Sequence, residues 1–375
     1  MKVQFKYRKS GLNHFLLSIL IIICSFIANG ENNFRGKIKV LNSEFIYTEA
    51  PFLQCHASTI IETEEGLLAA WFGGTHEKNP DVCIYTSSKI NGTWSTPVMI
   101  ADGIINESLR YPCWNPVLYH LPDGSIILFY KVGPNAQEWW GLFKTSNDQG
   151  KTWSEAKHLP TGFLGPIKNK PVLTKSQRLI CPSSTENPNT DQWKAHFEVS
   201  DDYGKTWKKI ELMDNEERFN IIQPSILFHD NNKLQMLARS KENFVISSWS
   251  DDNGEHWSQP EETELPNPNS GTDAVTLESG LQVIVFNPTK RTEGKWGGPR
   301  TPLEIAVSED GIHWKSVYTL EDSPGEFSYP AIIQSKDGTI HVTYTYKREK
   351  IKHVQLEIIQ KSRNYNYLNS DKIKT

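Results

Sequence analysis

Ser200-Asp-Asp202-Tyr-Gly204-Lys-Thr206-Trp207 is the stretch that decides the fold, because close variants of it recur along the chain. Near copies begin at Ser146 and Ser250, and a shortened copy begins at Ser308. Asn91-Gly-Thr-Trp94 has the form of the end of a fifth copy. The Trp residues that end these units fall at positions 94, 153, 207, 257 and 314, a period of about 50–60 residues. A period in this range predicts a repeat architecture such as a β-propeller.

The repeated unit has the composition of a tight turn between two strands. Its Asp can hydrogen-bond its own backbone, and the Gly two positions later adopts positive φ without steric cost. The Ser and Thr can tie the turn to its own main chain, and the Trp can cover the sheet below. We therefore interpret these Asp residues as structural groups on the rim and look for the chemistry elsewhere.

Each repeat shows the same order of strands: an apolar strand, a turn, a second apolar strand, a third that ends at the turn unit, and a short fourth. In the first repeat the predicted strands are His56–Thr63, Gly66–Gly73, Val82–Ser87 and Thr96–Ile100. The later repeats open near Trp114, Gly165, Ile222, Gly271 and Ser328. The sequence thus predicts an all-β fold, a six-bladed β-propeller of four-stranded antiparallel blades with these turns between strands.

The sixth repeat lacks a turn unit and an outer strand of its own. Residues 37–49 read as a lone strand before the first repeat, and we expect this strand to complete the sixth blade. Closure of the ring in this way leaves no long open sheet edge. We therefore place the propeller at residues 31–361 and a polar C-terminal tail at residues 362–375.

Residues 1–30 have the pattern of a secretory signal peptide. Lys2, Lys6, Arg8 and Lys9 precede an apolar run from Phe15 to Ala28, which ends in small residues. An uncleaved membrane anchor is the alternative, although the run is short for a span. We predict a secreted or periplasmic protein that has no stable membrane insertion after signal cleavage.

Charge and cysteine content limit the partners and cofactors. The formal net charge is −4, which does not suggest a nucleic-acid partner. Beyond residue 30 the cysteines are Cys55, Cys83, Cys113 and Cys181, and their spacing does not fit a metal site. We expect buried free thiols, while a disulfide between Cys55 and Cys83 stays open. No cofactor and no metal are expected.

Several phrases outside the turn units resemble the sialidase superfamily, and most closely the group known as predicted neuraminidases. They are Cys55-His56-Ala-Ser-Thr59, Ala70-Trp-Phe-Gly73-Gly74-Thr75, Gly165-Pro-Ile-Lys168-Asn-Lys170-Pro, Pro266-Asn-Pro-Asn-Ser-Gly271 and Ser328-Tyr329-Pro-Ala. The resemblance extends over nearly the whole chain after residue 30. It implies a carbohydrate-active protein whose chemistry lies at the openings of the six blades.

The resemblance also assigns candidate site residues. Sialidases hold the substrate carboxylate with three arginines, whose planar guanidinium groups suit bidentate hydrogen bonds. Arg239 and Arg300 match the second and third of these, and Tyr329 matches the nucleophile. His56 stands where the first arginine is expected, and Gln223 stands where a glutamate base is expected. For the acid/base Asp of the family we find no counterpart, since Asp81 better matches a structural Asp.

This partial match predicts an acidic oligosaccharide substrate and an altered mechanism. Our first hypothesis is β-elimination by a lyase or dehydratase at a uronic acid on the non-reducing end. Arg239 and Arg300 would neutralise the carboxylate, and His56 and Tyr329 would be base and acid in an order that the sequence leaves open. The alternatives are a sialidase-like exo-glycosidase with Tyr329 as nucleophile, and a glycan-binding propeller without activity.

Further polar and aromatic residues lie at blade openings or in long loops. Gln223, Lys168 and His196 complete the predicted substrate-binding set. Trp139 and Trp140 are candidates for sugar subsites. Residues of lower rank at the same openings are Asn115, Glu186, Asp273, Arg348 and His353.

Overall fold

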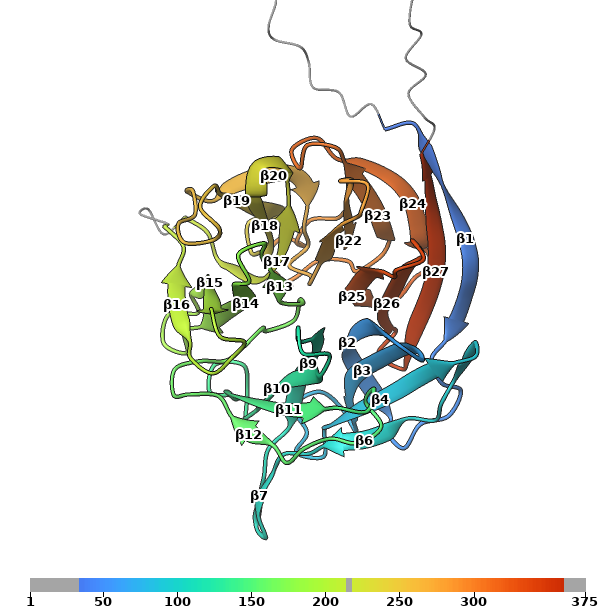
Figure 1. Ribbon diagram of the computed structural model, residues 1–375, viewed down its shortest axis with the longest axis vertical. Coiled ribbons are helices and arrows are strands. Elements are labelled where there is room, and N and C mark those ends of the chain that lie inside the picture. The colour runs from blue at the N-terminus through green and yellow to red at the C-terminus, as the bar shows by residue number, and fades with distance from the viewer. Residues whose placement is uncertain (1–33, 214–217, 361–375) are drawn as a thin grey trace, which may run out of the picture. The chain divides into compact units, whose positions relative to one another are not determined.

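The computed structural model describes residues 34–213 and 218–360. The predicted signal peptide and C-terminal tail lie outside these residues. The described chain from Phe34 onward is a ring of antiparallel sheets around a central axis (Figure 1). Six sheets contain four or more strands each, which confirms the predicted six-bladed propeller.

The strands of each blade follow one another along the chain, from the axis to the rim. Blade 1 contains β2 (Gln54–Thr63), β3 (Gly66–Gly74), β4 (Cys83–Ile90), β5 (Thr93–Trp94) and β6 (Val98–Ala101). Blade 2 contains β9 (Cys113–His120), β10 (Ile126–Val132), β11 (Trp140–Ser146) and β12 (Lys157–His158). Blade 3 contains β13 (Val172–Leu173), β14 (Leu179–Glu186), β15 (Trp193–Ser200) and β16 (Lys208–Glu211).

The second half of the ring repeats this order, except that the outer strand of blade 6 comes from the N-terminal side of the chain. Blade 4 contains β17 (Ile221–Phe228), β18 (Leu234–Ser240), β19 (Phe244–Ser250) and β20 (Glu261–Pro266), with one 3₁₀ turn, η1 (Asp230–Asn232). Blade 5 contains β21 (Asp273–Thr276), β22 (Gln282–Phe286), β23 (Leu303–Ser308) and β24 (Lys315–Glu321). Blade 6 contains β25 (Phe327–Gln334), β26 (Ile340–Tyr346), β27 (Lys350–Gln360) and β1 (Gly36–Phe45). A separate hairpin, β7 (Ile104–Asn106) with β8 (Leu109–Arg110), was not expected.

The N-terminal strand closes the ring, as predicted. β1 pairs antiparallel with β27, from Gly36 opposite Gln360 to Phe45 opposite Lys352. The two strands lie side by side at the edge of the ring in Figure 1. The strand ends at Phe45, four residues before the predicted end, and the next residues, Ile46 and Tyr47, are buried beneath blade 1.

The repeated turn unit has the hydrogen bonds that its composition predicts. In the copy at 200–207, the Ser200 Oγ donates to Asp202 Oδ1 at 2.8 Å and accepts from the Gly204 amide at 2.7 Å. The Thr206 amide donates to Asp202 Oδ1 at 2.8 Å, and the Trp207 Nε1 donates to the Gly204 carbonyl at 3.1 Å. These bonds hold the pKa of Asp202 at about 2. The carboxylate of Asp202 is therefore occupied by hydrogen bonds within its own turn.

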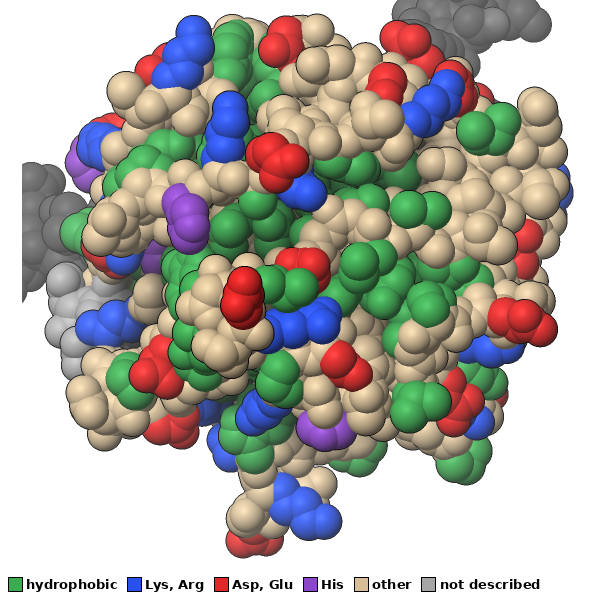
Figure 2. Space-filling view, turned by 90° about the horizontal axis from the view of Figure 1, so that it is seen from below, with side chains coloured by type: hydrophobic (Ala, Val, Ile, Leu, Met, Phe, Trp, Pro, Cys, Tyr) green, Lys and Arg blue, Asp and Glu red, His purple; other side chains and the backbone are tan. Residues whose placement is uncertain are grey.

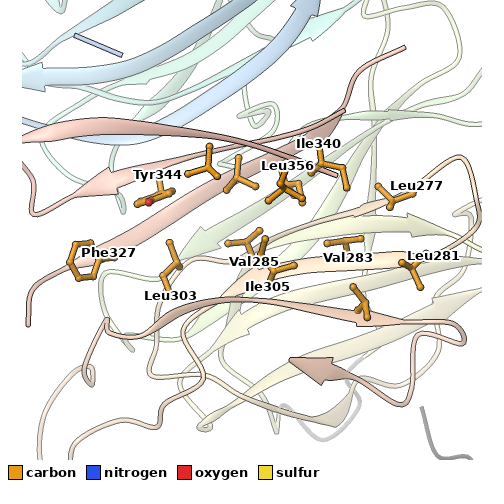
Figure 3. Packing of buried hydrophobic residues seen from close by; sticks show 14 of the residues in the cluster. Leu277, Leu281, Val283, Val285, Leu303, Ile305, Phe327, Ile340, Tyr344 and Leu356 are labelled. Atoms are coloured by element: carbon orange, nitrogen blue, oxygen red, sulfur yellow. The ribbon is translucent and has the colours of Figure 1, made fainter. Parts of the chain in front are cut away.

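Apolar side chains fill the space between neighbouring blades. The cluster between blades 5 and 6 is shown in Figure 3, where Val283 and Val285 of β22 lie opposite Ile340 and Tyr344 of β26. The side chains of these residues are at most 1% exposed. Because every blade buries both faces in this way, the positions of the blade openings are held by extensive packing.

The third blade departs from the predicted pattern. We expected its inner strand to begin near Gly165, whereas β13 begins at Val172 and is only two residues long. Pro166 and Pro171 lack the amide that a ladder needs, and residues 167–170 form no strand, although the Ile167 amide donates to the Pro182 carbonyl of β14 at 3.1 Å. This segment instead carries Lys168 into the centre of the ring, where its side chain is 4% exposed.

Asp273 links four blades across the centre. Its carboxylate accepts hydrogen bonds from Ser225 Oγ of β17 at 3.0 Å and from the Ile332 amide of β25 at 2.9 Å. It also forms an ion pair with Lys170 of the third repeat. Lys170 and Asp273 both line a cavity of about 540 Å³ at the far ends of the inner strands, which we call the rear cavity.

The charges on the surface are mixed in sign, and the described cysteines are not cross-linked. On the face shown in Figure 2, acidic and basic side chains are interspersed with hydrophobic ones. Cys55, Cys83, Cys113 and Cys181 are buried free thiols. Within residues 34–213 and 218–360, no helix has the length and apolar character to cross a membrane.

Candidate active site

Backbone bulges at the blade openings direct the candidate side chains. Ala57, Asn115, Gln223 and Tyr329 all have positive φ, between 28° and 56°. At each of these positions the pairing of the inner strand with its neighbour shifts register. Such a bulge redirects side chains, and positive φ in a residue other than glycine is maintained only where the surrounding structure enforces it. The openings of blades 1, 2, 4 and 6 therefore share the same kind of backbone bulge.

Tyr329, Arg239 and Gln223 meet at the mouth of the ring. The Arg239 Nη1 donates to the Tyr329 hydroxyl at 2.8 Å and to Gln223 Oε1 at 3.2 Å. The Gln223 Nε2 donates to the same hydroxyl at 3.2 Å. Because Arg239 can only donate, it fixes the orientation of the amide, with Nε2 toward Tyr329. Within the described residues, no carboxylate hydrogen-bonds the Tyr329 hydroxyl.

Arg239 is held on all sides. It comes from β18 and is 1% exposed. Its Nε donates to Asn269 Oδ1 at 2.8 Å, and its guanidinium carbon lies 5.3 Å from the ring centroid of Trp193 and 5.2 Å from that of Trp296. Two aromatic rings and one amide thus orient the group that contacts Tyr329.

His56 packs against Tyr329 and stays neutral. The centroids of the two rings are 4.1 Å apart. The His56 Nδ1 is 2.9 Å from the Thr345 Oγ1 of β26. Burial places the pKa of His56 well below its ordinary value, and the charges of Arg348, Arg300, Arg239 and Lys168 act in the same direction.

Arg300 belongs to a second charged group beside Tyr329. Its Nη1 donates to Glu326 Oε1 at 2.7 Å, and the same oxygen accepts from the Arg348 Nε at 3.1 Å. Arg348 also pairs with Glu77 of the β3–β4 loop. Although burial raises the pKa of Glu326, Arg300 and Arg348 outweigh that effect and hold it below its ordinary value. The side chains of Arg300 and Arg348 are 15% and 23% exposed, so both are accessible to a ligand.

Lys168 braces the centre of the site. Its ammonium donates to the Asn169 Oδ1 at 2.8 Å and to the carbonyls of Thr272 and Pro330 at 2.9 and 2.6 Å. These contacts use all three donors of the ammonium group. Burial lowers the pKa of Lys168 to about 7. Lys168 is therefore only partly protonated near neutral pH, and it acts on the site mainly through the position of Pro330, next to Tyr329.

Three cations surround the ring of Tyr329. The Lys168 Nζ lies 5.7 Å from the ring centroid, and the guanidinium carbons of Arg239 and Arg300 lie at 5.8 and 6.0 Å. A concentration of positive charge in a region of low dielectric favours an anionic ligand. No group of three or more His, Cys, Asp or Glu side chains that would suit a metal ion is found within the described chain.

His196 is not brought to this cluster. It lies on β15, is 1% exposed, and its Nε2 is 3.1 Å from Glu198 Oε1. Glu198 in turn accepts hydrogen bonds from the amides of Leu164 and Gly165, in the segment between blades 2 and 3. Among the hydrogen bonds of the described residues, none links His196 to Arg239, Gln223 or Tyr329.

Sequence reasoning gave too little weight to several residues of the site. Arg348 was of lower rank, and Asn269, Trp193, Trp296 and Glu326 were not singled out. Asn269 lies within one of the phrases quoted above and has φ of 64°, so its place in a constrained loop was the available signal. Asp81 accepts from the amide of Thr75 at 3.0 Å and shapes the β3–β4 loop, as expected for a structural Asp.

Comparisons with known proteins agree with the architecture. The profile of a family described as a BNR repeat-like domain matches residues 65–342. A crystal structure of a protein of unknown function from Dyadobacter fermentans superposes with a TM-score of 0.68 at 16% identity, covering 86% of this chain and 99% of that one. No curated protein matches the sequence.

Two similar structures are sialidases by name. The NanB sialidase from Streptococcus pneumoniae gives a TM-score of 0.65 at 14% identity, covering 84% of this chain and 70% of that one. The intramolecular trans-sialidase from Ruminococcus gnavus gives 0.63 at 14% identity, covering 85% and 97%. At these identities the likeness concerns the fold. The chain belongs to the BNR repeat-like domain family and has the six-bladed propeller fold that the sialidase structures share.

Proposed function

We propose that the protein is a carbohydrate-active enzyme that carries out β-elimination at a uronic acid on the non-reducing end of an acidic oligosaccharide. The observation that supports this most directly is the Tyr329 hydroxyl, which accepts hydrogen bonds from Arg239 and Gln223. Two donors would stabilise negative charge on this oxygen, as a general base requires. The adjacent cations favour a substrate with a carboxylate.

The proposed reaction begins with the carboxylate of the uronic acid at the accessible Arg300, near the buried charge of Arg239. Neutralisation of that charge makes the proton at C5 more acidic, and Tyr329 removes it. The electron pair of the C5–H bond forms the C4=C5 double bond as the C4–O bond breaks. The leaving oxygen is the C4 hydroxyl of the terminal sugar, which takes the proton from the newly protonated Tyr329 and departs as water. His56, kept neutral, holds the ring of Tyr329 in place.

A sialidase-like hydrolase is the second candidate, because the similar structures include sialidases. That mechanism needs a carboxylate next to the Tyr nucleophile. Here Gln223 occupies the neighbouring position and donates to the hydroxyl, so it cannot accept the proton. The geometry therefore favours elimination.

One experiment separates the candidates. The protein is incubated with glucuronate- and iduronate-terminated oligosaccharides, and the ultraviolet absorbance of the conjugated 4,5-double bond is recorded alongside the release of reducing sugar. Elimination at the terminal uronic acid raises only the absorbance, because the group lost from C4 is water and no glycosidic bond breaks. Hydrolysis raises only the release of reducing sugar, and a binding protein raises neither signal. Tyr329→Phe should reduce turnover by about 10²- to 10⁴-fold. The matched control is Tyr203→Phe, because the Tyr203 hydroxyl also hydrogen-bonds a side chain, that of Gln177, but lies in the turn unit of blade 3.

We also propose that the protein is exported. The support is the pattern of residues 1–30, namely basic residues, an apolar run and small residues in that order. N-terminal sequencing of the protein after expression in a secreting host checks this, since export predicts a start near residue 31.

A further inference from the structure

A cavity of about 490 Å³ lies between blades 2 and 3, beside the candidate active site. Its walls come from the β10–β11 loop, from the segment after β12 and from the end of β14. The residues used in the argument below are Gln137, Trp139, Trp140, His158, Phe163 and Glu186. Its volume falls in the range of small-molecule sites in proteins, about 300–1,000 Å³.

Strand direction places this cavity on the same side of the ring as the active site. The inner strands start at the mouth, so second strands end there and third strands begin there. Glu186 ends β14 and pairs with Trp193 at the start of β15. Trp193 is the residue whose ring lies 5.3 Å from Arg239, and the charge of Arg239 acts on Glu186. The cavity therefore adjoins the site through Glu186.

A series of aromatic contacts also connects the two places. The rings of His56 and Phe72 are 5.7 Å apart, those of Phe72 and Trp114 are 6.4 Å apart, and those of Trp114 and Trp139 are 5.7 Å apart. Each step has T-shaped geometry, which fixes the position of Trp139 relative to the bulge at the opening of blade 1. Trp139 is thus a rigidly supported wall of the cavity, although it belongs to a loop.

The chemistry of the lining matches a neutral sugar. Trp139, Trp140 and Phe163 are half-buried, so they offer apolar faces of the kind that stack on the C–H face of a pyranose. Gln137 and His158 are exposed and supply donors and acceptors for hydroxyl groups. The lining contains Glu186 but no Lys or Arg, so a second acidic sugar would be disfavoured there. Burial raises the pKa of Glu186, which brings it closer to a neutral hydrogen-bonding group.

We propose that this cavity is a subsite for a neutral pyranose residue of the same glycan whose terminal acidic sugar binds at Tyr329. The proposal rests on the proposed function for the order of the two sugars. It adds that the substrate is a mixed glycan, in which a uronic acid is linked to neutral sugars, and not a polymer of uronic acids alone. Elimination would leave the neutral residue linked to the unsaturated terminal sugar, whereas hydrolysis would leave it at the new end of the released chain.

Binding of ligands of graded length tests the subsite. Affinities of methyl β-glucuronide, of glucuronate-terminated di- to tetrasaccharides with neutral sugars, and of polyglucuronate of equal length are measured by calorimetry on the catalytically silenced Tyr329→Phe protein. With the cavity unchanged, the Tyr329→Phe protein should bind the mixed tetrasaccharide more tightly than the monosaccharide and the polyglucuronate. Trp139→Ala should weaken the tetrasaccharide by about tenfold or more and leave methyl β-glucuronide unchanged.

The control variants separate a local loss of stacking from a general defect. Trp139→Phe should recover most of the affinity, because it keeps an aromatic face. Gln137→Ala removes a hydrogen-bonding group of the cavity without touching the packing of Trp114, and it should weaken the tetrasaccharide alone. Trp249→Ala is the matched control, because Trp249 is also half-buried but stacks with His229 on the turn side of blade 4.

The outcomes distinguish this proposal from the proposed function. Equal tetrasaccharide affinity in the parent and Trp139→Ala proteins, with Gln137→Ala also unchanged, overturns the subsite. If methyl β-glucuronide fails to bind, the proposed function is in question, and neutral methyl pyranosides then test the cavity alone. Chemical-shift changes of the Trp139 indole on addition of those pyranosides support the cavity as a sugar site, and their absence overturns it.

Discussion

Asp273 gives the sharpest prediction on stability, because one carboxylate holds four blades together. It is 1% exposed and accepts from Ser225 Oγ, from the amides of Ala274 and Ile332, and from Lys170. Asp273→Ala removes the acceptor of the buried Ile332 amide and leaves the ammonium of Lys170 without its partner. Breaking a buried ion pair from one side costs about 3–5 kcal/mol, and we expect a loss in this range.

Replacing Lys170 should lower the free energy of unfolding less than replacing Asp273, because the two partners are not equivalent. In Lys170→Met the carboxylate of Asp273 keeps three of its donors. The Lys170 side chain is 16% exposed and lines the rear cavity, so part of its hydration is already present in the folded protein. Loss of one hydrogen bond to a charged group corresponds to about 1.5–3 kcal/mol. The expected order is therefore Asp273→Ala more destabilising than Lys170→Met.

Equilibrium unfolding in guanidinium chloride measures both changes, with tryptophan fluorescence and circular dichroism as coincident probes. The double variant should be less destabilised than the sum of the single variants, because the two residues interact directly. A loss below about 1 kcal/mol for Asp273→Ala, or a larger loss for Lys170→Met, would refute the reasoning.

Three further outcomes follow from the structure. Burial lowers the pKa of Lys131 and that of Lys168 to about 7, below their unfolded values, so above pH 7 the unfolded chain binds more protons than the folded protein. Stability should therefore rise with pH between about 7 and 10, by at most about 1.4 kcal/mol per pH unit from each residue. Lys131→Met should remove only the contribution of Lys131 in denaturation curves recorded across the range. Trp257→Ala should lower the unfolding free energy by about 3–5 kcal/mol, because Trp257 is 2% exposed and its ring centroid lies 4.1 Å from that of Phe197, on which it stacks. Turnover per folded molecule should not change, and a selective loss of turnover would contradict a structural role for the turn unit. Gln223→Glu places a carboxylate beside the Tyr329 hydroxyl, so elimination should fall and release of free sugar without a double bond should rise; unchanged elimination would count against Tyr329 as the base.

The sequence by itself determined the blade count, the phase of the strands and the closure by the N-terminal strand. The reason is that the turn unit is local. Its hydrogen bonds between Ser200, Asp202, Gly204 and Thr206 lie within a few residues, so each copy carries its whole structural signal. Strand alternation is equally local, and boundaries therefore agree within a few residues at most openings.

The resemblance to sialidases suggested Tyr329, Arg239, Gln223, His56 and Arg300, and the structure brings these five residues together around one point. Their contacts join residues far apart in the chain, such as Gln223 and Tyr329, separated by 106 positions. Such contacts depend on closure of the whole ring, which no short window of sequence encodes. The bulges that orient these side chains could not be predicted from the sequence either, because positive φ at Gln223 and Tyr329 is imposed by the fold and not by residue type.

Only the tertiary structure decided the roles of the charged residues near the axis. Lys168, expected to bind substrate, has all three donors engaged within the protein, and His196 pairs with Glu198 inside a blade junction. Arg348 shares Glu326 with Arg300 because the turn after β26 lies beside the start of β25 in the same blade. Residue type establishes which hydrogen bonds a side chain can make. Which of its donors and acceptors stay available for a ligand depends on the groups that the closed ring brings within hydrogen-bonding distance.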